Sequence, residues 1–104
     1  MSDPALTQYK HWKKQYPDVL VAVPVGSFWE FYNEDAEAVS KATGMSLLDS
    51  KRWGESVQVT GFPKNAGDSY VPRLIDAGHK VGLLHGPDVN PGGIMVARGW
   101  SIER

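Results

Sequence analysis

Hydrophobic and polar positions alternate along this chain in short segments that proline and glycine separate. The first segment has apolar side chains on one face at helical spacing, at Leu6, Tyr9, Trp12 and Tyr16. This spacing predicts a helix capped by Ser2 or Asp3, with Pro4 at its first position and its end at Pro17. Its lysines, Lys10, Lys13 and Lys14, are expected to lie away from the apolar face.

An apolar, β-branched run follows at residues 18–25, DVLVAVPV, and predicts a strand. Pro24 cannot donate a ladder hydrogen bond, so it is expected at an edge or at the end of this strand. Gly26-Ser27 predicts a hairpin turn. The aromatic run FWEFY, residues 28–32, is then the returning strand.

The remaining segments predict two more helices and further strands. Asn33 is expected as the N-cap of the helix EDAEAVSKAT, which Gly44 closes. MSLLDSK and SVQVTGF predict two strands around a turn at Trp53-Gly54. A helix is expected to start near Asp68, because Pro72 fits only the first turn, and to end at Gly78. KVGLLH and IMVARGWSIE predict the last two strands, the second bulged at Gly99.

This order of elements predicts an α/β protein of the α+β type. The 104 residues suit a single domain, residues 1–104, with a mixed β-sheet of five to six strands packed with three helices. Apolar residues make up 41% and charged residues 22% of the chain, as in ordinary globular proteins. Trp12 and Trp100 are assigned to the core.

Composition also limits the functions to consider. The chain has no cysteine, which excludes disulfides and thiolate metal sites and fits a reducing compartment. It lacks both a membrane-spanning stretch and the apolar segment of a signal peptide, so we expect a cytoplasmic protein with no membrane partner. The net charge of −1 argues against strong non-specific DNA binding, which depends on lysine and arginine.

Motifs for catalysis are mostly absent. There is no phosphate-binding loop of the Walker type, no nucleophile elbow and no His cluster at metal-ligand spacing, so we expect no enzyme, no cofactor and no metal. One alternative is a metal-dependent nuclease of the PD-(D/E)xK kind. Pro17-Asp18 and Asp49-Ser50-Lys51 match that pattern loosely. Aspartate is also common at turns, such as the one expected at Asp18.

Taken together, the segments resemble the N-terminal mismatch-recognition domain of the bacterial mismatch-repair protein MutS. The resemblance covers about residues 6–85 and is carried by LTQYKHWKKQYPDVLV, GSFWEFYNEDA, MSLLDSKR and VTGFPKNAGDSYVPRLIDAGHKVGLL. It implies that Phe28 stacks on a mispaired base and that Glu30 hydrogen-bonds that base. On a strand, Phe28 and Glu30 share one face, whereas Trp29 and Phe31 point to the other.

The resemblance also suggests which cations touch DNA. Lys51, Arg52 and Lys64 flank predicted turns, and Arg98 lies in the last strand, so all four are candidate phosphate contacts. Each is also consistent with an ordinary solvated side chain. The chain departs from the family at Ser27, Pro24 and Asn65, and lacks the connector, lever, clamp and ATPase domains. Its start at Met1 and its own last strand favour a free-standing relative over a fragment.

Two functions from different classes follow from these observations. The first is a non-enzymatic module that binds mispaired or distorted double-stranded DNA weakly when alone. The second is a protein-interaction module that keeps the fold and acts with a mismatch-repair or other DNA-processing protein without binding DNA. The slightly acidic charge and Pro24, at a position that is often basic in the family, favour the second function.

Overall fold

The computed structural model describes residues 4–52, 55–85 and 93–97. Along the chain the elements are α1 (Pro4–Gln15), β1 (Val19–Val25), β2 (Phe28–Tyr32), α2 (Asn33–Thr43), β3 (Leu48–Arg52), β4 (Glu55–Pro63), the 3-10 turn η1 (Lys64–Ala66), α3 (Gly67–Asp76), β5 (Lys80–His85) and β6 (Gly93–Ala97). The predictions for Ser2, Asp3, Trp53-Gly54, Arg98, Gly99 and Trp100 fall outside the described residues.

The strands form one six-stranded sheet in the order β3-β4-β2-β1-β5-β6. β1 and β5 are parallel, and every other neighbouring pair is antiparallel. The predicted mixed sheet with three helices is therefore confirmed. Pro24 lies beyond the parallel pairing, which ends at Ala22, so its missing N–H breaks no bond to β5.

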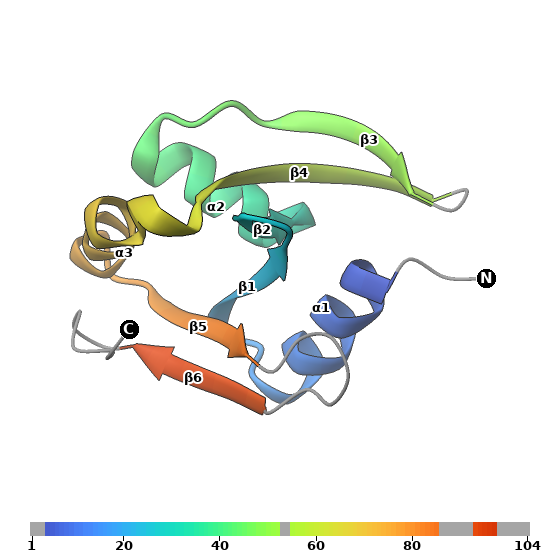
Figure 1. The fold of residues 1–104 in the computed structure, drawn as a ribbon, viewed down its shortest axis with the longest axis horizontal. Helices are drawn as coiled ribbons and strands as arrows, with labels where there is room; N and C mark the ends of the chain where they lie inside the picture. The colour runs from blue at the N-terminus through green and yellow to red at the C-terminus, as the bar shows by residue number, and fades with distance from the viewer. Residues whose placement is uncertain (1–3, 53–54, 86–92, 98–104) are drawn as a thin grey trace.

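The sheet is covered on both faces, and each face has its own apolar cluster. One cluster packs beneath α2 and α3 and includes Phe31, Phe62 and Leu74. The other packs beneath α1 and includes Leu6, Tyr9 and Tyr32. Figure 1 shows α2 and α3 together and α1 apart from them. None of the helices in the described ranges is long and apolar enough to cross a membrane.

Glycines follow two of the helices where the sequence places them. Gly44 takes a φ of 80° after α2, and its N–H donates to the carbonyl of Ser40 at 2.8 Å. Gly78 takes a φ of 96° after α3, and its N–H donates to the carbonyl of Ile75. Both residues adopt the left-handed region that favours glycine.

Three local predictions are wrong. Asn33 is not the N-cap but the first residue of α2, with a φ of 53°, because its Oδ1 accepts a hydrogen bond from the Gln58 N–H of β4 at 3.3 Å. Pro72 lies inside α3 rather than in its first turn, because η1 leads directly into α3 at Gly67. Lys13 does not lie away from the apolar face, because its ammonium pairs with the buried Asp35 at 2.8 Å.

Candidate nucleic-acid interface

The β1–β2 hairpin presents one exposed aromatic ring at its tip. Gly26 makes the turn with a φ of 59°, and Phe28 is the first residue of β2. The Phe28 side chain is 44% exposed, whereas Phe31 and Tyr32 further along the strand are fully buried. The hairpin therefore presents the flat apolar ring of Phe28 to solvent beside its turn.

The side chains of β2 alternate between the two faces of the sheet, as predicted. Trp29 and Phe31 pack in the cluster beneath α2 and α3. Tyr32 belongs to the cluster beneath α1, and Phe28 and Glu30 share its face by the two-residue period of the strand. Phe28 and Glu30 therefore project from the same side of the hairpin.

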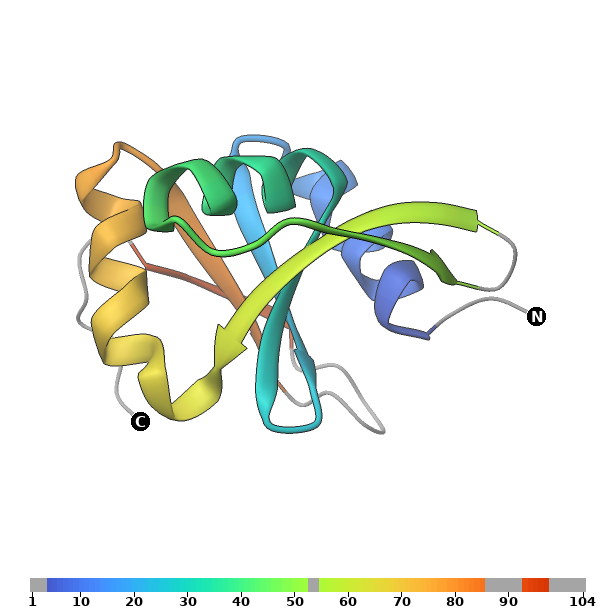
Figure 2. The same ribbon diagram turned by 90° about the horizontal axis from the view of Figure 1, so that it is seen from above.

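The backbone around Phe28 is held from both sides. Phe28 lies opposite Val25 of β1 and Pro63 of β4 in the sheet. The Lys64 N–H donates to the Ser27 carbonyl at 2.8 Å, which ties the turn to η1. Figure 2 shows this turn beside the segment that follows β4, at one end of the molecule. Phe28 thus projects from a braced strand rather than from a loose loop.

Glu30 is oriented by a buried tyrosine. The Tyr32 hydroxyl donates to Glu30 Oε1 at 2.6 Å, while the Tyr32 ring is fully buried. The Tyr9 ring meets the Tyr32 ring edge-on, with 5.6 Å between centroids. Strand alternation predicts that Glu30 shares the face of Phe28, whereas this hydrogen bond was not predicted. The i, i+2 spacing of the two residues on a strand is the signal that could have revealed it.

A buried ion pair lies behind the two tyrosines. Asp35 Oδ1 accepts from the Lys13 ammonium at 2.8 Å, and Oδ2 accepts from the Val21 N–H at 2.9 Å. Burial raises the pKa of the Asp35 carboxyl, and the hydrogen bond from Lys13 opposes that rise. Burial, followed by the charge of Asp35, raises the pKa of the Tyr9 hydroxyl. This group connects α1, β1 and α2.

Of the four predicted phosphate contacts, Lys64 is near Phe28. Its ammonium lies 5.4 Å from the centre of the Trp29 ring, a cation–π arrangement, and its side chain is exposed. Arg73 makes a similar contact with Tyr70, at 5.4 Å, and the Tyr70 ring stacks on Phe62. Arg73 is not among the phosphate contacts predicted from the sequence, because nothing in the local pattern shows that α3 brings it to an aromatic ring.

Lys51 and Arg52 lie at the other end of β4. Lys51 is opposite Ser56, and Phe28 is opposite Pro63, so seven residues of β4, roughly 23 Å, separate their positions. Lys51 also belongs to the opposite face of the sheet, because Ser56 and Pro63 differ by an odd number of residues. The structure does not bring Lys51 and Arg52 to Phe28, and Arg98 falls outside the described residues.

The nuclease motif is not assembled. Asp18 precedes β1 and Asp49 lies in β3, with β4 and β2 between these strands, so the two positions are at least about 14 Å apart. A Mg²⁺ ion binds its ligands at about 2.1 Å and cannot bridge this distance. The Asp18 carboxylate instead accepts a hydrogen bond from the Lys80 ammonium at 3.2 Å, which lowers the pKa of Asp18.

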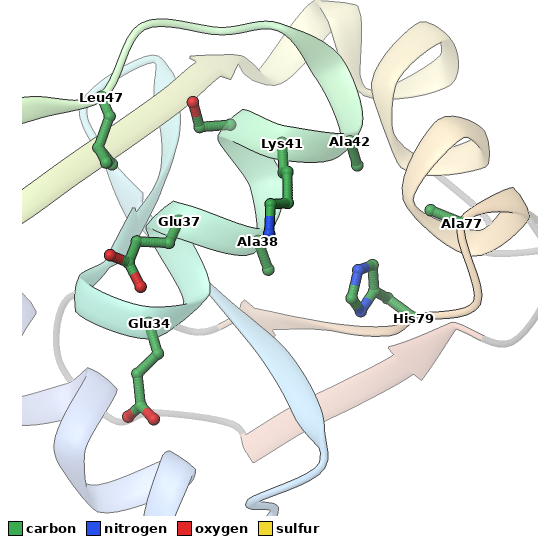
Figure 3. Close-up of a pocket in the computed structure, with 9 residues that line it drawn as sticks. Glu34, Glu37, Ala38, Lys41, Ala42, Leu47, Ala77 and His79 are labelled. Carbon is green, nitrogen blue, oxygen red and sulfur yellow. The ribbon is translucent and has the colours of Figure 1, made fainter.

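A shallow hollow of about 810 Å³ lies on the outer side of α2, away from Phe28. Figure 3 shows that its lining residues come from α2, the segment before β3 and the residues between α3 and β5. Ala38, Ala42 and Ala77 form its apolar floor, and Glu37, Lys41 and His79 lie around it. The hollow does not include Phe28 or Glu30.

Comparison with known families agrees with the fold. A family model described as MutS domain I matches residues 3–94, most of the chain. This chain belongs to the MutS domain I family. The resemblance expected from the sequence is thereby confirmed, and the helices and mixed sheet are consistent with the fold of the family.

Individual relatives of this MutS domain I chain are whole mismatch-repair proteins. The chain is 39% identical over 85 residues to the DNA mismatch repair protein MutS of Methanosarcina mazei, and 39% identical over 82 residues to that of Methanosarcina acetivorans. It is also 39% identical over 83 residues to the MutS of Parabacteroides distasonis. These matches cover 77–80% of this chain but only 9% of each relative, so the chain corresponds to a small part of their length.

Proposed function

We propose that this MutS domain I chain is a non-enzymatic module that recognises mispaired or distorted double-stranded DNA by stacking Phe28 on an unpaired base. The observation that carries the proposal is the Phe28 ring, 44% exposed at the tip of a hairpin whose other aromatic side chains are buried or packed against the core. Membership of the MutS domain I family supports it. A rigid aromatic side chain that a braced strand presents to solvent is suited to stacking on a base.

Selectivity for defects follows from the cost of unstacking. An apolar side chain that enters between base pairs must separate them, which costs about a few kcal/mol per step in a paired duplex. A mismatched or unpaired base has already lost part of that stacking and pairing energy. The same Phe28 ring would therefore insert at a defect more readily than elsewhere.

Glu30 and Lys64 have supporting roles in this proposal. Glu30 projects from the face of Phe28, where its carboxylate would accept a hydrogen bond from the base. Lys64 lies beside the turn and would neutralise a nearby phosphate. Lys64 is the cation placed near Phe28 among the residues that the structure describes, and Lys10, Lys13 and Lys80 are each paired to a carboxylate. We therefore expect weak binding by the isolated chain.

Fluorescence anisotropy at low salt tests the proposal with three labelled duplexes: fully paired, with a G·T mismatch, and with an unpaired thymidine. The wild-type protein is expected to bind the two defective duplexes more tightly than the paired one. Phe28→Ala should remove that difference without unfolding the protein, because the Phe28 ring lies at the surface. Equal affinity of the wild type for all three duplexes would refute mismatch recognition by this chain.

A second candidate function is docking to a mismatch-repair or other DNA-processing protein, without DNA. The observation that favours it is the hollow on α2, whose alanine floor leaves room for side chains of a partner. The net charge of −1 is also compatible with this function.

Substitution at the floor of the hollow separates the two candidates. Ala42→Arg would fill the hollow and leave Phe28 unchanged, whereas Phe28→Ala would remove the exposed ring and leave the hollow unchanged. If the chain is a docking module, Ala42→Arg should abolish co-purification with a mismatch-repair protein and Phe28→Ala should not. The DNA-binding proposal predicts the opposite sensitivity in the anisotropy measurement.

A further inference from the structure

We propose that Tyr32 is a positioning residue, which fixes the Glu30 carboxylate and thereby favours bases that present a ring N–H group on their pairing edge. This inference rests on the proposed function and adds a specificity to it. Tyr32 itself is buried and is not expected to touch DNA.

The geometry gives the Tyr32 hydroxyl little freedom. The whole residue is 0% exposed, and its ring packs edge-on against Tyr9 within the cluster beneath α1. The hydroxyl donates to Glu30 Oε1 at 2.6 Å, a short distance that is typical of a hydrogen bond to a carboxylate. The buried Tyr32 hydroxyl therefore holds one carboxylate oxygen of Glu30, whose side chain lies near the surface.

This arrangement reduces the cost of using Glu30 in recognition. A glutamate side chain has several rotatable bonds, and ordering it on binding costs conformational entropy. The Tyr32 hydroxyl orders it in advance, on the face of the strand that also carries Phe28. The ring that would stack and the carboxylate that would read the stacked base are thus held on one rigid strand.

The chemistry of the carboxylate indicates which bases it would favour. An ionised carboxylate only accepts hydrogen bonds. On the pairing edge, thymine and guanine carry a ring N–H. Adenine and cytosine carry their N–H on an amino group, next to a ring nitrogen that is itself an acceptor and repels a carboxylate. A fixed Glu30 should therefore favour an unpaired thymine over an unpaired adenine, although both can stack on Phe28.

Tyr9 provides a matched control for Tyr32. Both are buried tyrosines of the same cluster, and their rings are in contact. The Tyr9 hydroxyl is buried and has no hydrogen-bond partner among the described residues. Tyr9→Phe and Tyr32→Phe each remove one buried hydroxyl, but only Tyr32→Phe removes the hydrogen bond to Glu30.

The test is anisotropy with an unpaired thymidine or an unpaired deoxyadenosine in the same duplex, using the wild type, Tyr32→Phe and Tyr9→Phe. The wild type and Tyr9→Phe should prefer the thymidine, and Tyr32→Phe should lose about fivefold of that preference. Binding to the deoxyadenosine duplex, which depends on stacking, should change little. An unchanged preference in Tyr32→Phe, or equal weakening on both duplexes, would overturn the inference.

A measurement without DNA separates failure of this inference from failure of the proposed function. Side-chain coupling constants from NMR report whether Glu30 occupies one rotamer. One rotamer in the wild type and in Tyr9→Phe, and averaging in Tyr32→Phe, would establish the positioning role. Averaging in the wild type would refute it. Absence of selective DNA binding by the wild type would instead refute the proposed function, and with it the base preference.

Discussion

The Tyr9 hydroxyl is buried in the core beneath α1 without a well-formed hydrogen bond to any of the described residues, although Asp35 lies near enough to raise its pKa. Tyr9→Phe is therefore expected to raise the free energy of unfolding by about 1 kcal/mol, as measured by urea denaturation. Because the pKa of Tyr9 is raised on folding, the folded state is favoured when Tyr9 is protonated. This contribution to the free energy of unfolding is fully present below pH about 10 and is lost as the pH rises further. Tyr9→Phe should lack that alkaline loss, and a lower stability of this variant at pH 7 would contradict the assignment.

Gly61 is required by the close approach of β4 to β2. A Cβ atom at this position would lie 2.3 Å from the carbonyl oxygen of Trp29 and 3.3 Å from the Cα of Glu30. Both atoms belong to the backbone, so no side-chain rotation relieves the clash. Gly61→Ala should lower the free energy of unfolding by about 3 kcal/mol and should also weaken discrimination between mismatched and paired DNA, because β2 carries Phe28 and Glu30.

Gly44→Ala is the control for Gly61→Ala. A Cβ at Gly44 meets no atom within 4 Å, but its φ of 80° is unfavourable for alanine and costs about 1–2 kcal/mol. Gly44→Ala should thus lower stability and leave selective DNA binding intact. If both variants lose discrimination between mismatched and paired DNA to the same extent, that discrimination depends on overall stability and not on the β2–β4 contact.

At the scale of elements, the sequence predicts the helices and strands well because their apolar periodicity and their glycines are local features. FWEFY and EDAEAVSKAT form β2 and α2 within about a residue of the expected bounds. The errors at Asn33 and Lys13 have one cause: each side chain bonds an element that is distant in sequence, Gln58 in β4 and Asp35 in α2. Such partners become visible only when the sheet is assembled.

The Lys13–Asp35 pair ties α1 to α2 across the edge of β1. Its side chains are 20% and 3% exposed, so removal of Lys13 leaves a carboxylate in the core. Lys13→Met should lower the free energy of unfolding by about 3 kcal/mol at pH 7. The exposed Lys14 on the same helix provides the control, and Lys14→Met should change stability by less than about 0.5 kcal/mol.

The deficit of Lys13→Met should depend on pH. Burial already raises the pKa of Asp35, and loss of the Lys13 hydrogen bond and charge would raise it further. A carboxyl whose pKa is raised on folding stabilises the folded state at low pH and loses this contribution as the pH rises through the folded pKa. Urea denaturation should therefore show a smaller deficit near pH 4 than at pH 7, whereas a deficit that grows on acidification would contradict the assigned pair.

At the scale of the whole molecule, the proposed DNA contacts lie at two separate places. Lys64 is beside the turn that carries Phe28, and Lys51 is roughly 23 Å away along β4, the length of about seven base pairs of duplex. Lys64→Gln should weaken binding to every duplex and lower the slope of log K against log salt by about 1.

Duplex length tests whether Lys51 takes part. Lys51 is on the face of the sheet opposite Phe28, so a duplex bound at Phe28 would reach it only by passing the far end of β4. In that case, Lys51→Gln should weaken binding only when the duplex extends about 12 base pairs from the defect, and not when it extends about 5. No effect at either length would remove Lys51 from the interface. An effect at both lengths would place the DNA differently from the path along β4.

The candidate site is only partly predictable from the sequence. The alternation of a strand suffices to place Phe28 and Glu30 on one face and Trp29 and Phe31 on the other. Sequence position does not reveal that Lys51 and Lys64 end up at opposite ends of β4, nor that Tyr32 holds Glu30. Those relations depend on strand register and side-chain packing, which the local pattern does not specify.

Insertion of Phe28 at a defect is the central claim, and a fluorescent base beside the defect tests it most directly. 2-Aminopurine, whose emission depends on stacking, would be placed next to an unpaired thymidine and, as a control, in a fully paired duplex. The account predicts that the wild type changes the emission at the defect but not in the paired duplex, and that folded Phe28→Ala changes neither. The same emission change with Phe28→Ala as with the wild type would contradict stacking by Phe28.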